Sequence, residues 1–111
     1  MRKLQKLTSL DMIEKFIQEH ELAFLYISRP NCGVCHGLLP QVRELLMNYP
    51  EIKLGHADAD EVMEIAGRFS VFTVPVLLLF VGGKEYIREA RIVHLSLLDK
   101  KLQKIYNNVV G

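Results

Sequence analysis

Two cysteines, Cys32 and Cys35, lie three residues apart in the segment Cys-Gly-Val-Cys, and the chain has no other cysteine. Thiols at this spacing can close a small disulfide, and such a pair where a strand meets a helix is typical of a redox site. The unpaired backbone N–H groups and the positive dipole end of a helix N-terminus favour a thiolate over a thiol. We therefore expect Cys32 to attack a target disulfide and Cys35 to resolve the mixed disulfide that forms.

Three other interpretations of the cysteine pair compete with a redox site. Two buried structural cysteines would also explain it, although the spacing and the strand–helix junction favour redox chemistry. A structural zinc ion usually needs four ligands, and only His36 lies beside the pair. Residues 32–36 also have the spacing of a haem-attachment motif, but covalent haem is normally added outside the cytoplasm and no export signal is visible. We expect neither a metal nor a bound cofactor.

The elements that must position the pair follow from the hydrophobic periodicity on either side of it. Residues 21–28 are a nearly continuous apolar run, which is typical of a central parallel strand buried on both faces. Residues 29–31 interrupt this strand, and the apolar spacing over residues 33–48 predicts a helix that Pro40 should kink. The pair therefore lies between a buried strand and the start of a helix.

The remaining segments continue the alternation of strands and helices. Thr8 and Asp11 match a capping box that would start the first helix. Gly82 and Gly83 permit a tight turn between two antiparallel strands. The expected strands cover residues 3–7, 52–57, 76–81 and 84–92, and the expected helices cover residues 8–20, 60–69 and, opened by Ser96, 96–107. The predicted order is β-α-β-α-β-α-β-β-α, which belongs to the α/β class.

Length and composition exclude several classes of protein. The chain has 111 residues, of which 50% are hydrophobic, and its 14 basic and 13 acidic residues give a net charge of +1. We expect residues 1–111 to form a single domain with its own core. Charges that are balanced and interspersed argue against nucleic-acid binding. The longest apolar stretch, residues 74–81, is too short to cross a membrane, and no signal sequence is visible, so we expect a cytoplasmic protein.

The chain resembles the thioredoxin family over almost its whole length. The resemblance rests on the buried strand at 24–27, the cysteine motif, Pro40, the run Thr73-Val74-Pro75 and the pair Gly82-Gly83. It implies the thioredoxin fold, which is a three-layer αβα arrangement with a central mixed sheet. It also implies a monomeric dithiol-disulfide oxidoreductase that reduces protein disulfides and contributes to cell redox homeostasis. A reductase or a low-molecular-weight thiol would recycle it.

The resemblance also implies a docking surface beside the cysteines. The proline that matches Pro75 has a cis peptide bond in thioredoxin-like proteins, so we expect the Val74–Pro75 bond to be cis. The backbone of Thr73 and Val74 would pair with an extended target segment, and Gly33 would let the target backbone approach closely. The other interpretation of Pro75 is an ordinary proline at the start of a strand.

Several positions depart from the thioredoxin pattern. Asn31 replaces a tryptophan, and Val34 replaces the proline of the usual motif. The buried aspartate and the lysine of the family fall on Tyr26 and Leu54, so we expect the usual proton relay to be absent. A tyrosine, with an ordinary pKa of about 10, is not an ionised base at neutral pH. Arg91 falls near a family glycine of the docking groove, where it would narrow the groove or select acidic targets.

His36 is the nearest candidate to assist Cys35. Its other interpretation is a solvent-facing helix residue that adds positive charge near the thiolate when protonated. The histidines at positions 20, 56 and 94 form no metal-ligand pattern, and we expect structural or surface roles for them. The departures from the family pattern leave two alternatives: a thioredoxin-fold adaptor with little redox turnover, and a disulfide isomerase or oxidant.

Overall fold

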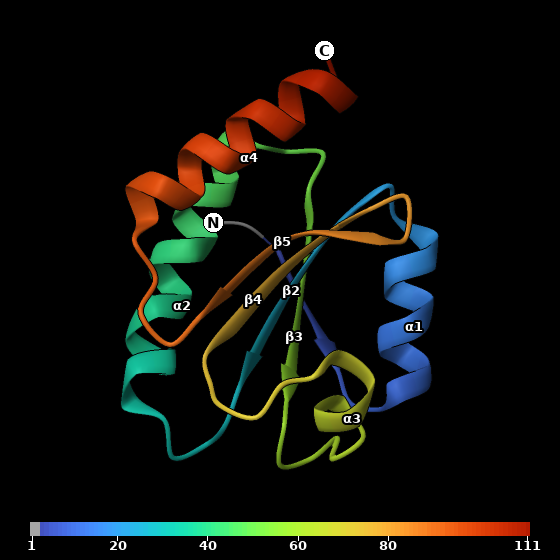
Figure 1. Cartoon of the computed structure of the whole chain (residues 1–111), viewed down its shortest axis with the longest axis vertical. Coiled ribbons are helices and arrows are strands. Elements are labelled where there is room, and N and C mark those ends of the chain that lie inside the picture. The colour runs from blue at the N-terminus through green and yellow to red at the C-terminus, as the bar shows by residue number, and fades with distance from the viewer. Residues whose placement is uncertain (1–2) are drawn as a thin grey trace.

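The computed structural model describes residues 3–111, and Figure 1 shows them as a twisted sheet with helices on both faces. The strands and α-helices follow the order that the periodicity predicts. They are β1 (Leu4–Leu7), α1 (Leu10–Glu19), β2 (Leu22–Ser28), α2 (Gly33–Leu45), the 3₁₀ helix η1 (Leu46–Asn48), β3 (Lys53–Asp58), α3 (Ile65–Phe69), β4 (Val76–Val81), β5 (Lys84–Ala90) and α4 (Leu95–Val109).

The sheet is mixed, with the strand order β1-β3-β2-β4-β5. Strands β1 and β2 are both parallel to β3, whereas β4 is antiparallel to β2 and to β5. Every residue of the central strand β2 is buried, as its continuous apolar run predicts for a strand covered on both faces. Among residues 3–111, no helix is both long enough and apolar enough to cross a membrane.

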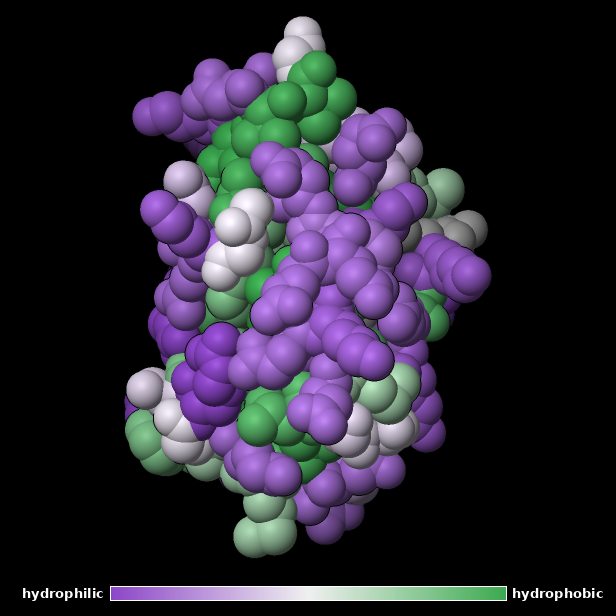
Figure 2. Space-filling model, turned by 90° about the vertical axis from the view of Figure 1, so that its right-hand side faces the viewer, coloured by the Kyte–Doolittle hydropathy of each residue, from purple (hydrophilic) through white to green (hydrophobic). Residues whose placement is uncertain are grey.

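Successive side chains of β2 enter two different cores, because side chains alternate between the faces of a sheet. Ala23, Leu25 and Ile27 pack with buried residues of α1 and α3, on the right in Figure 1. Phe24 and Tyr26 face the other way and pack against buried residues of α2 and α4. Figure 2 shows the molecule from the α1 side, where the surface is mainly hydrophilic. The three-layer αβα arrangement is therefore confirmed.

Three chain segments meet at the edge of the sheet where β2 ends. Ile27 of β2 pairs with Val76, so β4 begins beside the end of β2. Val76 in turn pairs with Ala90, so β5 ends at this same edge. The backbone N–H of Arg91 donates to the carbonyl oxygen of Pro75 at 3.0 Å. This edge therefore holds the start of α2, the residues before β4 and the residues after β5.

Two helix starts differ from the prediction. The N-cap of α1 is Ser9, whose hydroxyl accepts the N–H of Met12 at 3.1 Å, and the expected Thr8 capping box is wrong. The helix expected over residues 60–69 begins only at Ile65. The reason is that the Asp58 carboxylate accepts the N–H groups of Asp60 and Glu61, and this turn competes with helix formation.

The other ends differ by a few residues. Strand β1 begins at Leu4, β3 covers residues 53–58 in place of 52–57, and α2 changes to η1 at Leu46. Helix α4 begins at Leu95 with His94 as its N-cap, one residue before the expected Ser96. Strand β5 ends at Ala90 because Arg91 has a φ of 65°, which an extended strand does not accommodate.

The tight turn between β4 and β5 is confirmed. Gly82 and Gly83 have φ angles of 56° and 85°, and the flanking residues Val81 and Lys84 pair across the hairpin. Positive φ at both central residues is the requirement that makes glycine favourable in such turns. Pro40 lies inside α2, as expected, and the kink assigned to it stays a prediction.

Candidate redox site

Cys32 and Cys35 form a disulfide at the N-terminus of α2, with their Cα atoms 5.2 Å apart. Cys32 is the N-cap residue, and its carbonyl oxygen accepts the N–H of His36 at 3.2 Å. The backbone N–H of Cys35 donates to the Cys32 sulfur at 3.1 Å. After reduction, this N–H and the helix dipole would stabilise negative charge on the Cys32 sulfur.

The two sulfurs differ in how accessible they are. Cys35 has 1% of its surface exposed, whereas Cys32 is half-buried and its neighbours Gly33 and Val34 are exposed. A sulfur from another molecule therefore reaches Cys32 and not Cys35. This asymmetry allows one thiol to react with a substrate while the other remains inside to close the ring.

Tyr26 lies beneath the pair and has no exposed surface. Its hydroxyl donates to the carbonyl oxygen of Cys35 at 2.6 Å. Burial raises the pKa of Tyr26 to about 12, so the hydroxyl keeps its proton and acts as a donor rather than a base. Leu54, the other position of the expected relay, is buried and apolar. Neither side chain can therefore take a proton from Cys35 at neutral pH.

His36 contacts the loop that leads into the site. Its Nε2 atom lies 2.8 Å from the carbonyl oxygen of Pro30, and its side chain is exposed. The hydrogen bond links the first turn of α2 to the residues just before Cys32. This contact gives His36 a part in holding the loop in place.

A further polar pair near Tyr26 was not predicted from the sequence. The Ser28 hydroxyl and Nε2 of His56 lie 2.6 Å apart, and the His56 ring packs edge-on against Tyr26. Burial lowers the pKa of His56, and the charge of Asp58 opposes this shift. Both histidines, His36 and His56, line a pocket of about 350 Å³ beside the loop before Cys32. The pairing of β2 with β3 places Tyr26 opposite His56, and this register is not visible in the local sequence pattern.

The segment before β4, residues 73–75, lies at the same edge of the sheet as the cysteine pair. The Val74–Pro75 peptide bond is cis, Pro75 is buried and Thr73 is exposed. Within residues 3–111, the backbone groups of Thr73 and Val74 make no hydrogen bond to another backbone group. These groups are available to an extended segment of another chain.

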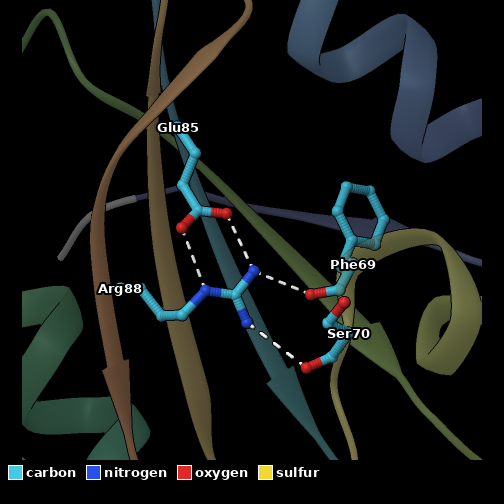
Figure 3. A network of polar contacts seen from close by, with 4 residues as sticks. All are labelled: Phe69, Ser70, Glu85 and Arg88. Carbon is cyan, nitrogen blue, oxygen red and sulfur yellow. Dashed lines mark hydrogen bonds and ion pairs between the residues drawn. The ribbon is translucent and has the colours of Figure 1, made fainter.

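Arg88 of β5 anchors the chain that leads into this segment, and the sequence pattern had not singled it out. Figure 3 shows its guanidinium between Glu85 and the C-terminal end of α3. Arg88 donates to the carbonyl oxygen of Phe69 at 2.7 Å and to both carboxylate oxygens of Glu85 at 2.9 and 2.8 Å. These bonds lower the pKa of Glu85. Ser70, which follows Phe69, has a left-handed φ of 55°, and its carbonyl oxygen also faces Arg88.

A groove lies between α2 and the segment that follows β5. It has a volume of about 390 Å³ and is lined by Val34, Gly37, Leu38, Gln41, Arg91, Ile92, Val93 and Leu95. Val34 lies between the two cysteines in sequence, so the groove adjoins the disulfide. In the part of the chain that the structure describes, no three His, Cys, Asp or Glu side chains are placed to hold a metal ion.

Comparisons with known proteins agree with this arrangement. The thioredoxin family model matches residues 4–104. The thioredoxin-like protein YdfQ of Bacillus subtilis is 58% identical over 111 residues, which cover 100% of this chain and 99% of that protein. Thioredoxin 1 of a Nostoc species is 29% identical over 76 residues, which cover 68% of this chain and 71% of that protein.

Solved structures have the same fold. The thioredoxin of Trypanosoma brucei brucei has a TM-score of 0.82 and 20% identity, with 95% of this chain and 92% of that chain covered. The thioredoxin of Fasciola hepatica has a TM-score of 0.78 and 26% identity, with 89% of this chain and 97% of that chain covered. A family match over most of the chain, a closely similar relative and a disulfide at the helix N-terminus lead to one conclusion: this chain belongs to the thioredoxin family.

Proposed function

We propose that this thioredoxin-family disulfide oxidoreductase reduces disulfide bonds in protein substrates and thereby contributes to cell redox homeostasis. The observation that carries the proposal is the asymmetry of the pair. Cys32 is accessible at the helix N-terminus and accepts the N–H of Cys35, while the Cys35 side chain is buried behind it. This arrangement suits one attacking thiol and one resolving thiol.

The reaction begins with both cysteines reduced. The Cys32 thiolate attacks one sulfur of the substrate, a Cys32–substrate bond forms as the substrate S–S bond breaks, and the leaving sulfur takes a proton from solvent. Cys35 then loses its proton to solvent and attacks the Cys32 sulfur. The Cys32–substrate bond breaks, the Cys32–Cys35 disulfide forms, and the second substrate sulfur takes a proton from solvent and leaves as a thiol. Two electrons and two protons pass to the substrate. A reductase or a low-molecular-weight thiol returns the disulfide to the dithiol, so no bound cofactor is needed.

The substrate would dock at the edge of the sheet just before β4. An extended segment would pair with the free backbone groups of Thr73 and Val74, while Pro75 shapes the surface from its buried position. A Cβ atom added to Gly33 would meet no atom within 4 Å, which supports an open approach for the substrate backbone. Tyr26 and His36 would act by holding Cys35 and the preceding loop in position.

The setting of the proposal is the cytoplasm. A reducing compartment keeps a dithiol supplied with electrons, which suits a reductase. Residues 1–111 would work there as one domain and as a monomer. Sedimentation of the reduced protein tests the monomer, and limited proteolysis tests the single domain.

The test combines a measurement of the redox potential of the Cys32–Cys35 couple with a trapping experiment. We expect the couple to show a two-electron transition near the roughly −270 mV typical of thioredoxins. A redox potential of about −180 to −120 mV would instead indicate an isomerase or an oxidant. The Cys35→Ser variant should accumulate mixed disulfides with substrate proteins through Cys32. The Cys32→Ser/Cys35→Ser variant is the control and should capture none.

The second candidate is an adaptor with little redox turnover. It is favoured by Tyr26 and Leu54, since neither can assist proton transfer at Cys35. An adaptor would still bind partners, but the Cys35→Ser variant would trap none of them. Absence of any reversible transition, together with absence of trapping, would overturn the oxidoreductase and leave the adaptor.

A further inference from the structure

The wall of the groove opposite α2 is formed by the residues that follow β5. Ile92 is 76% exposed on this wall, and Val34 is 66% exposed on the α2 side next to the disulfide. Two uncovered apolar side chains thus face a groove of about 390 Å³, and one of them, Val34, lies between the two cysteines in sequence. Of the residues between 3 and 111 that line it, Arg91 alone is charged.

The backbone of Arg91 is in an unfavourable conformation. Its φ of 65° lies in the left-handed region, which glycine adopts freely and which a Cβ atom makes costly. The hydrogen bond from its N–H to the Pro75 carbonyl oxygen holds this conformation and ties Arg91 to the docking edge. Residues kept in such conformations beside a reactive site are candidates for a functional role.

The charge of Arg91 is uncompensated. Its side chain is exposed, and it makes no ion pair with any residue in the range 3–111. In contrast, Arg29, Arg68 and Arg88 are each paired with a carboxylate. A guanidinium left free at the edge of an otherwise uncharged groove matches a carboxylate, to which it can donate two parallel hydrogen bonds.

We propose that Arg91 makes this protein select substrate segments that carry an aspartate or glutamate close to the disulfide-forming cysteine. The occupant of the groove is an extended, partly apolar segment of the substrate protein, with its carboxylate on Arg91 and apolar groups on Val34 and Ile92. This inference rests on the proposed reduction of protein disulfides. Arg91 is a specificity-determining residue, because it lies in the groove wall and is not one of the reacting groups.

The test uses three disulfide-linked peptides that differ at one residue beside the cysteine, which is glutamate, glutamine or lysine. The reduced protein should favour the glutamate peptide over the glutamine peptide by about two- to fivefold in kcat/KM, the range of an exposed ion pair. The lysine peptide should be the poorest substrate. Raising the salt concentration should reduce these differences, because salt screens exposed charges.

Variants then assign the preference to one side chain. Arg91→Gln should remove the preference, Arg91→Lys should keep part of it, and Arg91→Glu should reverse it. Arg91→Gly is the variant that guards against misfolding, because glycine accepts the positive φ, and it too should lose the preference. Lys104→Gln, which removes one positive charge from an exposed site on α4, is the matched control and should keep the preference.

The possible outcomes separate the two proposals. If no peptide is reduced, the proposed function is wrong and this inference falls with it. If all three peptides are reduced equally, or if Arg91→Gln keeps the preference, selection by Arg91 is wrong while the reductase function stands.

Discussion

At the residue scale, Tyr26 stands where the thioredoxin pattern has a buried aspartate, and it acts there as a hydrogen-bond donor. Its hydroxyl satisfies the carbonyl oxygen of Cys35, and burial raises its pKa to about 12. An acid at this position would exchange protons with the resolving thiol, whereas a tyrosine only fixes the backbone of that thiol. The proton of Cys35 must therefore leave to water or to a group outside the Tyr26–Leu54 pair.

Tyr26→Phe tests this structural role. Removing the buried donor should lower the free energy of unfolding of the oxidised protein by about 1 kcal/mol, measured by urea denaturation. The pH profile of disulfide reduction between about pH 6 and 9 should keep its shape, because Tyr26 does not titrate in that range. Tyr86→Phe, at a tyrosine that is 59% exposed, is the control. A change in the shape of the profile would show that Tyr26 exchanges protons.

His56 makes stability depend on pH. Burial is the largest effect on its pKa and lowers it, His36 and Lys6 lower it further, and Asp58 opposes them. The unfolded chain therefore takes up a proton at this residue before the folded chain does. The contribution to stability is complete above the ordinary histidine pKa of about 6.5 and is lost as the pH falls through the lower pKa of the folded state.

The variant His56→Gln isolates this contribution. It retains a side chain that can hydrogen-bond to Ser28 but cannot be protonated. The decrease in the urea midpoint between pH 7.5 and pH 5 should be smaller in this variant than in the unaltered protein. His94→Gln, at an exposed histidine, should leave the decrease unchanged. An equal decrease in the unaltered protein and His56→Gln would rule out His56 as its source.

At the element scale, the position of the proposed docking edge, residues 73–75, depends on how α3, β4 and β5 are joined. Arg88 of β5 donates to the carbonyl oxygens at the end of α3, and the chain then passes directly to Thr73 and Pro75. A cation placed on the last carbonyl groups of a helix is favourable, because those groups have no partner within the helix. The position of the edge thus depends on a side chain of a later strand.

Arg88→Gln should loosen this connection. We expect a loss of about 1 kcal/mol in unfolding free energy at pH 7 and faster amide hydrogen exchange over residues 71–74, because the guanidinium contacts are partly exposed. Lys84→Gln removes an exposed cation at the other end of β5 and should change neither measurement. Unchanged exchange over residues 71–74 in Arg88→Gln would mean that the docking edge does not depend on Arg88.

Glu85 gives the same contact a pH dependence. Its hydrogen bonds from Arg88 lower the pKa of its carboxyl. The stability that this pair supplies is present above the ordinary glutamate pKa and is lost as the pH falls through the lower pKa of the folded state. The difference in unfolding free energy between Arg88→Gln and the unaltered protein, measured by urea denaturation, should therefore be smaller near pH 3 than at pH 7.

At the scale of the whole molecule, packing of α1 on the sheet requires a residue without a side chain in β3. A Cβ atom on Gly55 would lie 2.6 Å from the Leu7 side chain and 3.0 Å from the Phe16 ring. Leu7, Phe16 and the sheet belong to the core that holds the β1-α1-β2 unit in place. The close approach explains a glycine in the middle of a buried strand.

Gly55→Ala should destabilise the folded protein, because the core must shift to admit a methyl group. We expect a loss of about 1–3 kcal/mol in unfolding free energy, measured by urea denaturation. Gly67→Ala is the matched control, since a Cβ atom there meets nothing within 4 Å in α3. It should leave stability unchanged or raise it by up to about 1 kcal/mol, because alanine favours helix more than glycine does. Equal effects of the two substitutions would contradict the packing argument.

The local pattern of the sequence is sufficient to predict the order of the elements and the buried central strand. It also predicts the turn at Gly82 and Gly83 and the position of Cys32 and Cys35 at the start of a helix. Each of these depends on neighbours in the chain: apolar periodicity, glycine at positive φ, or a cysteine spacing at a strand–helix junction. The thioredoxin resemblance adds the three-layer arrangement, which the structure contains.

Only the tertiary structure decided which distant side chains meet. Strand pairing places His56 beside Tyr26, and the β4–β5 hairpin brings Arg88 to the end of α3. The same pairing brings Arg91 to Pro75 and closes one wall of the groove. Such contacts follow from the register between strands that are far apart in the chain, and local periodicity carries no information about that register.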